Sequence, residues 1–299
     1  MASLRQSILR LQNTLLWRCE DERIYAAVRI GFALVAFANL ILLWPDRLVF
    51  LSNRGLVDQG VTMAHHPWIY LSVFQWIENP AGVTSFLIFS GFSMLLLALG
   101  ILPRTAALVV FLWHLSFVAR APVVVTGWDQ VLQAFSFLVL ISPMGRAWSL
   151  VSCWRPMVVA MVPRYGLTLM RLQVAVIYLQ TVLLKLGSPY WRNGEFMTYY
   201  LLSHNSRRPG NWVLPYEGPL GLVTFVALLA ECAIPFLLFA GRTRFWGFLL
   251  GFVLHGGISL VSRNLEMFFA TMLMTYLAFL RDGDVEKIGQ WFRSKPVPE

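Results

Sequence analysis

The chain has 299 residues, of which 58% are hydrophobic and 13% are charged, and its formal net charge is +9. A soluble domain carries charge on roughly a quarter of its residues, so this composition excludes an ordinary soluble domain and predicts an integral membrane protein. The basic excess then indicates contact with lipid headgroups at the cytoplasmic face, and we expect the lipid bilayer and no nucleic acid as a partner.

Residues 1–24 are predicted to form a cytoplasmic N-terminal segment. They contain several arginines and lack an apolar core followed by a small-residue cleavage site. Because a secretory signal peptide needs both of those features, we expect the first membrane span to be retained.

Apolar runs then recur along residues 25–280, which we predict to be one transmembrane domain, followed by a cytoplasmic tail at residues 281–299. A bilayer core about 30 Å thick needs about 20 mostly apolar residues per helix. The fold class is therefore all-α, a polytopic helix bundle with about eight spans, although seven or nine would also fit. The spans are expected at residues 25–44, 82–102, 104–121, 128–143, 165–187, 218–240, 244–262 and 264–280.

The distribution of basic residues predicts the orientation. With the N-terminus inside, the inner segments carry about twice as many lysines and arginines as the outer ones, as the positive-inside rule requires. Both termini are thus predicted to be cytoplasmic. In the first long outer connection, Trp68, Tyr70, Phe74 and Trp76 are expected to form an aromatic belt on a helix at the membrane interface.

Ionisable residues at membrane depth need a partner or a function. Deep in the bundle, we expect Arg29 and Arg171 to form a structural ion pair with Glu231, because an arginine stabilises a carboxylate in lipid. A second group is predicted at the outer ends of five spans, where it would line an outward pocket if the helix faces converge. This group contains His114, Arg120, Asp129, Lys185, His255 and Glu266.

Lys185 is the only lysine outside the C-terminal tail. Unlike arginine, a desolvated lysine loses its proton readily and can act as a base. The alternative is that its ammonium reaches the outer headgroups from the helix end. His255, followed by Gly256 and Gly257, has room for a ligand beside it, although it could equally be a hydrogen-bonded core residue. Without HxxxH or ExxH spacing, we predict no metal.

Five segments, in this order, resemble the HTTM (horizontally transferred transmembrane) domain, the membrane part of vitamin K-dependent γ-glutamyl carboxylases. The similarity covers nearly the whole chain. The segments are FLSNRGLVDQG (50–60), TGWDQ (126–130), YLQTVLLKLGSPYWRNG (178–194), ECAIPFLLFAGRTR (231–244) and LHGGISLVSRNLEMF (254–268).

The resemblance implies a catalytic role for Lys185 as the base that deprotonates reduced vitamin K or a related quinol, with His255 at the position of a histidine on a later helix. O2 is then a co-substrate, and CO2 is one in the carboxylase. The chemistry is expected on the non-cytoplasmic side of the membrane, here a bacterial inner membrane. Together with the outward group, the resemblance predicts the following quinol-binding residues: Asp129, Trp128, His114, Tyr178, Trp191 and Glu266.

The sequence departs from the carboxylase in three respects. Val131 stands near the place of a histidine, Leu184 stands where the carboxylase has a second lysine beside the one at position 185, and the large lumenal domain that holds the peptide substrate is expected to be missing. The acceptor is therefore open, and a secreted peptide or a separate substrate-binding protein would be the further partner. The leading hypothesis is a membrane enzyme that oxygenates a quinol to its epoxide, with coupled carboxylation as an option. The alternative is a non-catalytic HTTM factor in maturation, export or immunity for a secreted peptide.

Overall fold

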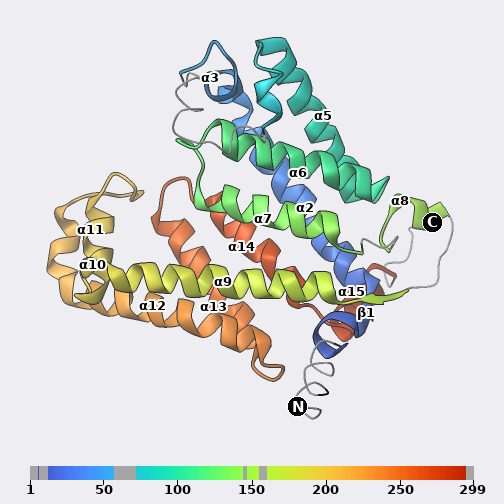
Figure 1. Cartoon of the computed structure of the whole chain (residues 1–299). Coiled ribbons are helices and arrows are strands. Elements are labelled where there is room, and N and C mark those ends of the chain that lie inside the picture. The colour runs from blue at the N-terminus through green and yellow to red at the C-terminus, as the bar shows by residue number, and fades with distance from the viewer. Residues whose placement is uncertain (1–5, 7–12, 57–71, 144–146, 155–159, 294–299) are drawn as a thin grey trace, which may run out of the picture. The chain divides into compact units, whose positions relative to one another are not determined.

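The protein is described by a computed structural model that covers residues 6, 13–56, 72–143, 147–154 and 160–293 (Figure 1). The chain divides into two compact units. Unit 1 consists of Met1–Met170 and Leu280–Glu299, and unit 2 consists of Arg171–Phe279. The boundary between the units falls within one long helix, α9 (Tyr165–Gly187).

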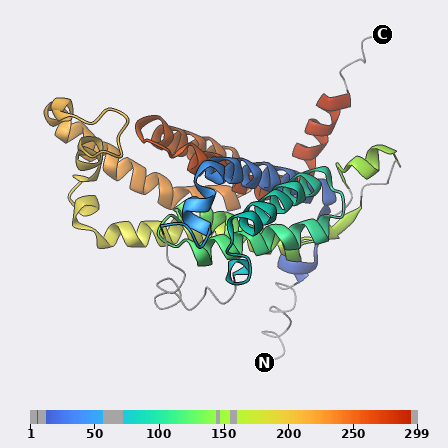
Figure 2. The ribbon, with the colours of Figure 1, turned by 90° about the horizontal axis from the view of Figure 1, so that it is seen from above.

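Unit 1 contains four apolar helices that pack in series. Each packs on the next in the chain: α2 on α5, α5 on α6, and α6 on α7. Figure 2 shows α2 and α5 side by side from above. Their bounds are Glu22–Leu43 for α2, Pro80–Leu99 for α5, Pro103–Arg120 for α6 and Gly127–Ile141 for α7.

Local sequence signals determine where these helices begin and end. The Asn79 side chain accepts a hydrogen bond from the Gly82 amide and so caps the start of α5. The helix begins with Pro80, and the first helical turn tolerates a proline because its amide protons have no partner within the helix. Gly100 ends α5 in the left-handed region, at φ 68°, where a side chain would be strained.

Unit 1 also contains shorter elements. Two three-residue strands, β1 and β2, pair antiparallel, a feature that the sequence did not reveal. The bounds are η1 Asn13–Trp17, β1 Cys19–Asp21, η2 Trp44–Asp46, α3 Arg47–Leu51, η4 Val73–Gln75, α8 Leu150–Trp154, β2 Met161–Pro163 and α15 Asp282–Arg293.

Unit 2 contains the C-terminal part of α9 and three further apolar helices. Of these, α12 packs on α13 and α13 on α14, as the orange and red ribbons of Figure 1 show. The remaining elements are α10 Pro189–Arg192, α11 Phe196–Leu202, η5 Asn211–Tyr216, α12 Glu217–Phe239, α13 Arg244–Val261, α14 Glu266–Tyr276 and η6 Leu277–Phe279.

Each of the eight predicted spans coincides with a helix. Among the described residues, five helical stretches are long and apolar enough to cross a membrane. Two of the others are short, since α7 has 15 residues and α14 has 11. The count of eight spans and the orientation of the termini stay predictions. The five long stretches are Glu22–Leu51, Pro80–Leu99, Tyr165–Gly187, Asn211–Phe239 and Arg244–Val261.

The aromatic belt expected in the first outer connection is wrong for Phe74. This ring is fully buried in unit 1 and packs edge-on against Phe86 and Trp113, because the chain turns inward at the 3-10 turn that contains it. Trp76, two residues later, is exposed. Residues 68 and 70 of the expected belt lie outside the described residues.

Candidate functional site in unit 2

Lys185 lies near the C-terminal end of α9, and its ammonium has two partners within the protein. It forms an ion pair with Glu231 of α12, and Nζ lies 4.4 Å from the centroid of the Trp191 ring in α10. The side chain is 23% exposed, whereas that of Glu231 is buried. The ammonium is thus bound by a carboxylate and an aromatic face, which simple anchoring in lipid headgroups would not require.

The expected ion pair between Glu231 and a deep arginine is corrected by this contact. The Nε of Arg171 donates to the Ala278 carbonyl at 2.7 Å, and the guanidinium of Arg29 donates to the carbonyl of Trp148 at 2.9 Å. Both arginines thus donate to backbone carbonyls, and the Glu231 carboxylate is paired with Lys185 instead. Lys185 was expected near the outer end of its span and Glu231 deeper in the bundle. The long side chain of the lysine spans this difference in depth, so its ammonium reaches the carboxylate.

A chain of three buried side chains lies in the same unit. The Tyr178 hydroxyl is 2.5 Å from Nε2 of His255, and it also bonds to the hydroxyl of Tyr276. The His255 side chain is only 2% exposed, and its other nitrogen, Nδ1, has no hydrogen-bond partner among the described residues. A buried polar atom without a partner is rare enough to indicate a ligand or an ordered water.

The helix face that carries His255 is built for close approach. Gly247, Gly251 and His255 follow each other at intervals of four on α13, and all three are buried. A Cβ on Gly251 would lie 2.6 Å from Cζ of Tyr276 and even closer to its hydroxyl oxygen. Only glycine at position 251 therefore admits Tyr276 to the chain of hydrogen bonds.

Tyr276 and Gly251 were not predicted as site residues. The sequence around Tyr276 is an apolar run and gives no indication that this tyrosine belongs to a site. The spacing of small residues along α13 is a usable signal for Gly251, because small residues at intervals of four let membrane helices approach closely. The sequence directed attention to Gly256 and Gly257 instead. A Cβ on Gly257 would meet nothing, so that position does lie beside open space.

The ion pair and the hydrogen-bonded chain are joined by α9, because Tyr178 and Lys185 both belong to this helix. The two residues are seven positions apart, which places them on the same face of α9, two turns from each other. We refer to these side chains together as the unit 2 polar cluster. It consists of Lys185, Glu231, Trp191, Tyr178, His255 and Tyr276.

Glu266 does not take part in the unit 2 polar cluster. Its side chain is 59% exposed at the start of α14 and pairs with Arg207. Glu266 is the first residue of α14, and its exposed carboxylate lies at the positive end of the helix dipole, which it stabilises. The expected quinol contact is therefore not supported for this residue.

Asp129 and Trp128 belong to unit 1, where they form a polar network of their own. One Asp129 oxygen accepts from the Asn39 amide at 2.8 Å, and the other accepts from the backbone amide of Thr126 at 2.9 Å in a capping box. The indole of Trp128 donates to the Asn39 side-chain oxygen. These contacts give Asp129 a structural role at the start of α7.

His114 is buried in unit 1. Its Nδ1 lies 2.8 Å from the Val110 carbonyl and donates to it, which leaves Nε2 as an acceptor without a partner among the described residues. The ring packs against Phe32. This geometry agrees with a core histidine, and the prediction that His114 and Asp129 share a pocket with Lys185 stays a prediction.

The unit 2 polar cluster contains an amine, a carboxylate, an imidazole and two phenols in a largely apolar unit. Such a set can accept, donate and pass protons, and its unpartnered atoms can hydrogen bond a polar headgroup. In the part of the chain that the structure describes, no three His, Cys, Asp or Glu side chains come together to hold a metal ion.

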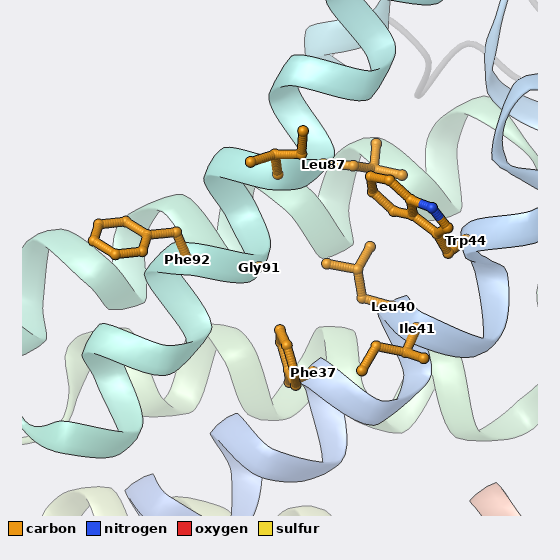
Figure 3. Close-up of a pocket in the computed structure, with 8 residues that line it drawn as sticks. Phe37, Leu40, Ile41, Trp44, Leu87, Gly91 and Phe92 are labelled. Atoms are coloured by element: carbon orange, nitrogen blue, oxygen red, sulfur yellow. The ribbon is translucent and has the colours of Figure 1, made fainter.

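A separate groove of about 180 Å³ lies between α2 and α5 in unit 1 (Figure 3). Its lining is apolar and includes Phe37, Leu40, Trp44, Leu87 and Phe92. Because no ionisable side chain lines it, the groove offers shape and apolar surface but no means of proton transfer.

Five helical stretches of membrane-spanning length and a buried polar cluster define an integral membrane protein. The family model of the HTTM domain matches residues 17–283, nearly the entire chain. The protein therefore belongs to the HTTM family, which includes the membrane domain of vitamin K-dependent carboxylase. Neither curated proteins nor solved structures give a significant match.

Proposed function

We propose that the protein is a membrane enzyme that deprotonates a lipid-soluble quinol, such as reduced vitamin K, and so promotes its oxygenation by O2. The observation that supports this proposal most strongly is the ion pair of Lys185 with Glu231, two turns along α9 from the tyrosine that bonds to the buried His255. Membership of the HTTM family adds a precedent for quinol chemistry, because the family includes the membrane domain of vitamin K-dependent carboxylase.

Lys185 must lose its proton before it can act as a base. In the proposed mechanism, one proton moves from Nζ of Lys185 to the Glu231 carboxylate with which it is paired, which gives a neutral amine and a carboxylic acid. The free amine then accepts a proton from a quinol hydroxyl, and Glu231 keeps the cluster electrically neutral until this happens.

The available hydrogen-bonding atoms fit a quinol headgroup. Oε2 of Glu231 and Nδ1 of His255 lack partners among the described residues, and both side chains are buried. One quinol and one O2 supply the atoms of one quinone epoxide and one water. The contribution of the protein is to take up the hydroxyl proton at Lys185 and to hold the headgroup at His255.

The remaining parts of the proposal concern partners and location. We place the reaction on the non-cytoplasmic face of a bacterial inner membrane, in agreement with the distribution of basic residues. CO2 is a further co-substrate if the oxygenation is coupled to carboxylation. The acceptor would then be a secreted peptide, brought to the enzyme by its own affinity or by a separate binding protein.

The test measures O2 consumption and epoxide formation by purified protein in lipid nanodiscs with a reduced naphthoquinol. Lys185→Arg keeps the charge opposite Glu231, but a guanidinium does not release its proton. We expect the rate to fall at least about 100-fold, because a positioned general base contributes about 10²–10⁴. Lys287→Ala changes an exposed lysine of α15 and should retain the wild-type rate.

Two results would contradict the proposal. The first is the absence of quinol-dependent O2 consumption by the wild-type protein. The second is a Lys185→Arg variant as active as wild type, which would show that the charge matters and the basicity does not. The first result would favour the alternative of a non-catalytic HTTM factor that uses the unit 2 polar cluster for binding.

A further inference from the structure

The hydrogen-bonded chain of Tyr276, Tyr178 and His255 can run in either of two directions. A hydroxyl both donates and accepts, and a neutral imidazole carries its proton on one nitrogen or the other. The Tyr178 hydroxyl bonds to Nε2 of His255 on one side and to the Tyr276 hydroxyl on the other. The positions of these atoms are compatible with both directions.

In the first direction, Tyr276 donates to Tyr178, and Tyr178 donates to Nε2 of His255. The proton of the imidazole is then on Nδ1, which becomes a hydrogen-bond donor. In the second direction, Nε2 carries the proton and donates to Tyr178, which donates to Tyr276, so that Nδ1 becomes an acceptor. The two arrangements contain the same number of protons and differ only in tautomer and hydroxyl rotation.

Nδ1 of His255 is the end of this chain at which a ligand would bind. It is buried, and no described residue bonds to it. A quinol hydroxyl can accept a hydrogen bond but also has a proton to donate, whereas the oxidised headgroup presents a carbonyl that only accepts. If Nδ1 were fixed as a donor, the hydroxyl proton of a bound quinol would lack an acceptor at this nitrogen, and if Nδ1 were fixed as an acceptor, a quinone carbonyl would lack a donor. Either mismatch in a buried site weakens binding.

We propose that the Tyr276–Tyr178–His255 chain lets one histidine bind both the reduced and the oxidised headgroup by reversing its hydrogen bonds. This proposal rests on the quinol ligand of the proposed function. Tyr276 is a positioning residue in this scheme, because it acts on the ligand only through Tyr178 and His255. Gly251 is part of the device, since a side chain at that position would displace Tyr276.

The variant Tyr276→Phe tests the proposal, because it leaves the Tyr178 hydroxyl with His255 as its remaining described partner. A hydroxyl whose proton has no acceptor in a buried site is unfavourable, so Tyr178 should then donate to Nε2 of His255. Nδ1 is thereby held as a donor, which suits the quinone carbonyl. We expect the affinity for the quinol to fall relative to that for the quinone by about two- to tenfold, the range of one hydrogen bond.

The measurement is equilibrium binding of a methylnaphthoquinone with a short isoprenoid tail and of its chemically reduced quinol, without O2, to protein in nanodiscs. The readout is the ratio of the two dissociation constants, since a loss of folded protein lowers the apparent amount of both complexes equally. Tyr25→Phe is the matched control. It removes a buried hydroxyl of unit 1 that donates to the Pro163 carbonyl, and it should leave the ratio unchanged.

Each outcome supports or overturns the proposal. A shifted ratio in Tyr276→Phe with an unchanged ratio in Tyr25→Phe supports it. The reversible chain is rejected if both forms bind and the ratio in Tyr276→Phe equals that of wild type, or if wild type binds only one form. In either case the proposed function is still decided separately, by quinol-dependent O2 consumption. If neither form binds, both proposals fail. Should Tyr276→Phe not fold, Gly251→Ala displaces the same hydroxyl and should shift the ratio in the same direction.

Discussion

Substitution of Gly251 by alanine is the sharpest test of how unit 2 is packed. The new Cβ would lie 2.6 Å from Cζ and 2.7 Å from Cε2 of Tyr276, distances that no relaxed contact allows. The Tyr276 side chain is buried, so its ring has little space into which it can turn. The ring must move as a whole, and its hydrogen bond to Tyr178 breaks.

The expected loss of stability follows from three effects. Overpacking of a filled core costs about 1–3 kcal/mol, and the lost hydrogen bond adds about 1 kcal/mol. Replacing glycine by alanine within a helix returns about 1 kcal/mol of helix propensity. We therefore expect the free energy of unfolding to fall by about 1–3 kcal/mol.

Gly257→Ala is the matched control on the same helix. The same atoms are added six residues further along α13, at a position where a Cβ meets nothing. Only the gain in helix propensity remains there, so this variant should be as stable as wild type or more stable by up to about 1 kcal/mol. Unfolding by denaturant in detergent micelles, followed by circular dichroism, should place the two variants about 1–4 kcal/mol apart. Equal stability of the two would refute the packing argument.

Three further substitutions test single contacts by the same unfolding measurement. Asp129→Ala removes the carboxylate of the capping box at the start of α7 and its hydrogen bond to the Asn39 amide, and should cost about 2 kcal/mol. A loss below about 0.5 kcal/mol would show that this network is dispensable. Glu231→Ala leaves the Lys185 ammonium without its carboxylate and should cost about 1–3 kcal/mol, a range reduced because the lysine is partly exposed. Glu231→Gln should cost less, and the reverse order would contradict the ion pair. Arg207→Ala breaks an exposed pair with Glu266 and should change stability by less than about 1 kcal/mol, so a larger loss would show that this pair fixes the loop that contains Arg207.

The helices were predictable because apolar run length is a strong signal in a membrane protein. In a membrane, a run of about 20 apolar residues must satisfy its backbone hydrogen bonds internally, and an α-helix does so. Each predicted span accordingly coincides with a helix. The signal weakens for α7 and α14, which have fewer residues than a bilayer core requires. Run length alone therefore identifies these helices without deciding whether they cross the membrane.

The partner of Glu231 could not be predicted in the same way. Hydrophobic periodicity gives the buried face of one helix, but the rotation of two helices about their axes decides which side chains meet. Arg171 and Lys185 share a face of α9, so the sequence offered two cations for one carboxylate. Arginine was the expected partner on chemical grounds, and the reach of the lysine side chain decided otherwise.

The two halves of the unit 2 polar cluster differ in charge, and this difference suits them to different tasks in the proposed function. The Lys185–Glu231 half contains the ionisable pair and keeps part of the lysine exposed, which lowers the free energy of holding charge in an apolar unit. The half around His255 can remain neutral and still satisfy its hydrogen bonds, so it tolerates full burial.

Under the proposed function, Lys185 takes up the proton, whereas His255 and the two tyrosines recognise the headgroup. If this division holds, Lys185→Arg should abolish turnover while the quinol still binds, and Tyr276→Phe should alter the ratio of quinol to quinone affinity while proton uptake at Lys185 continues. A variant of one half that reproduced the defect of the other would show that the cluster works as a single charged site.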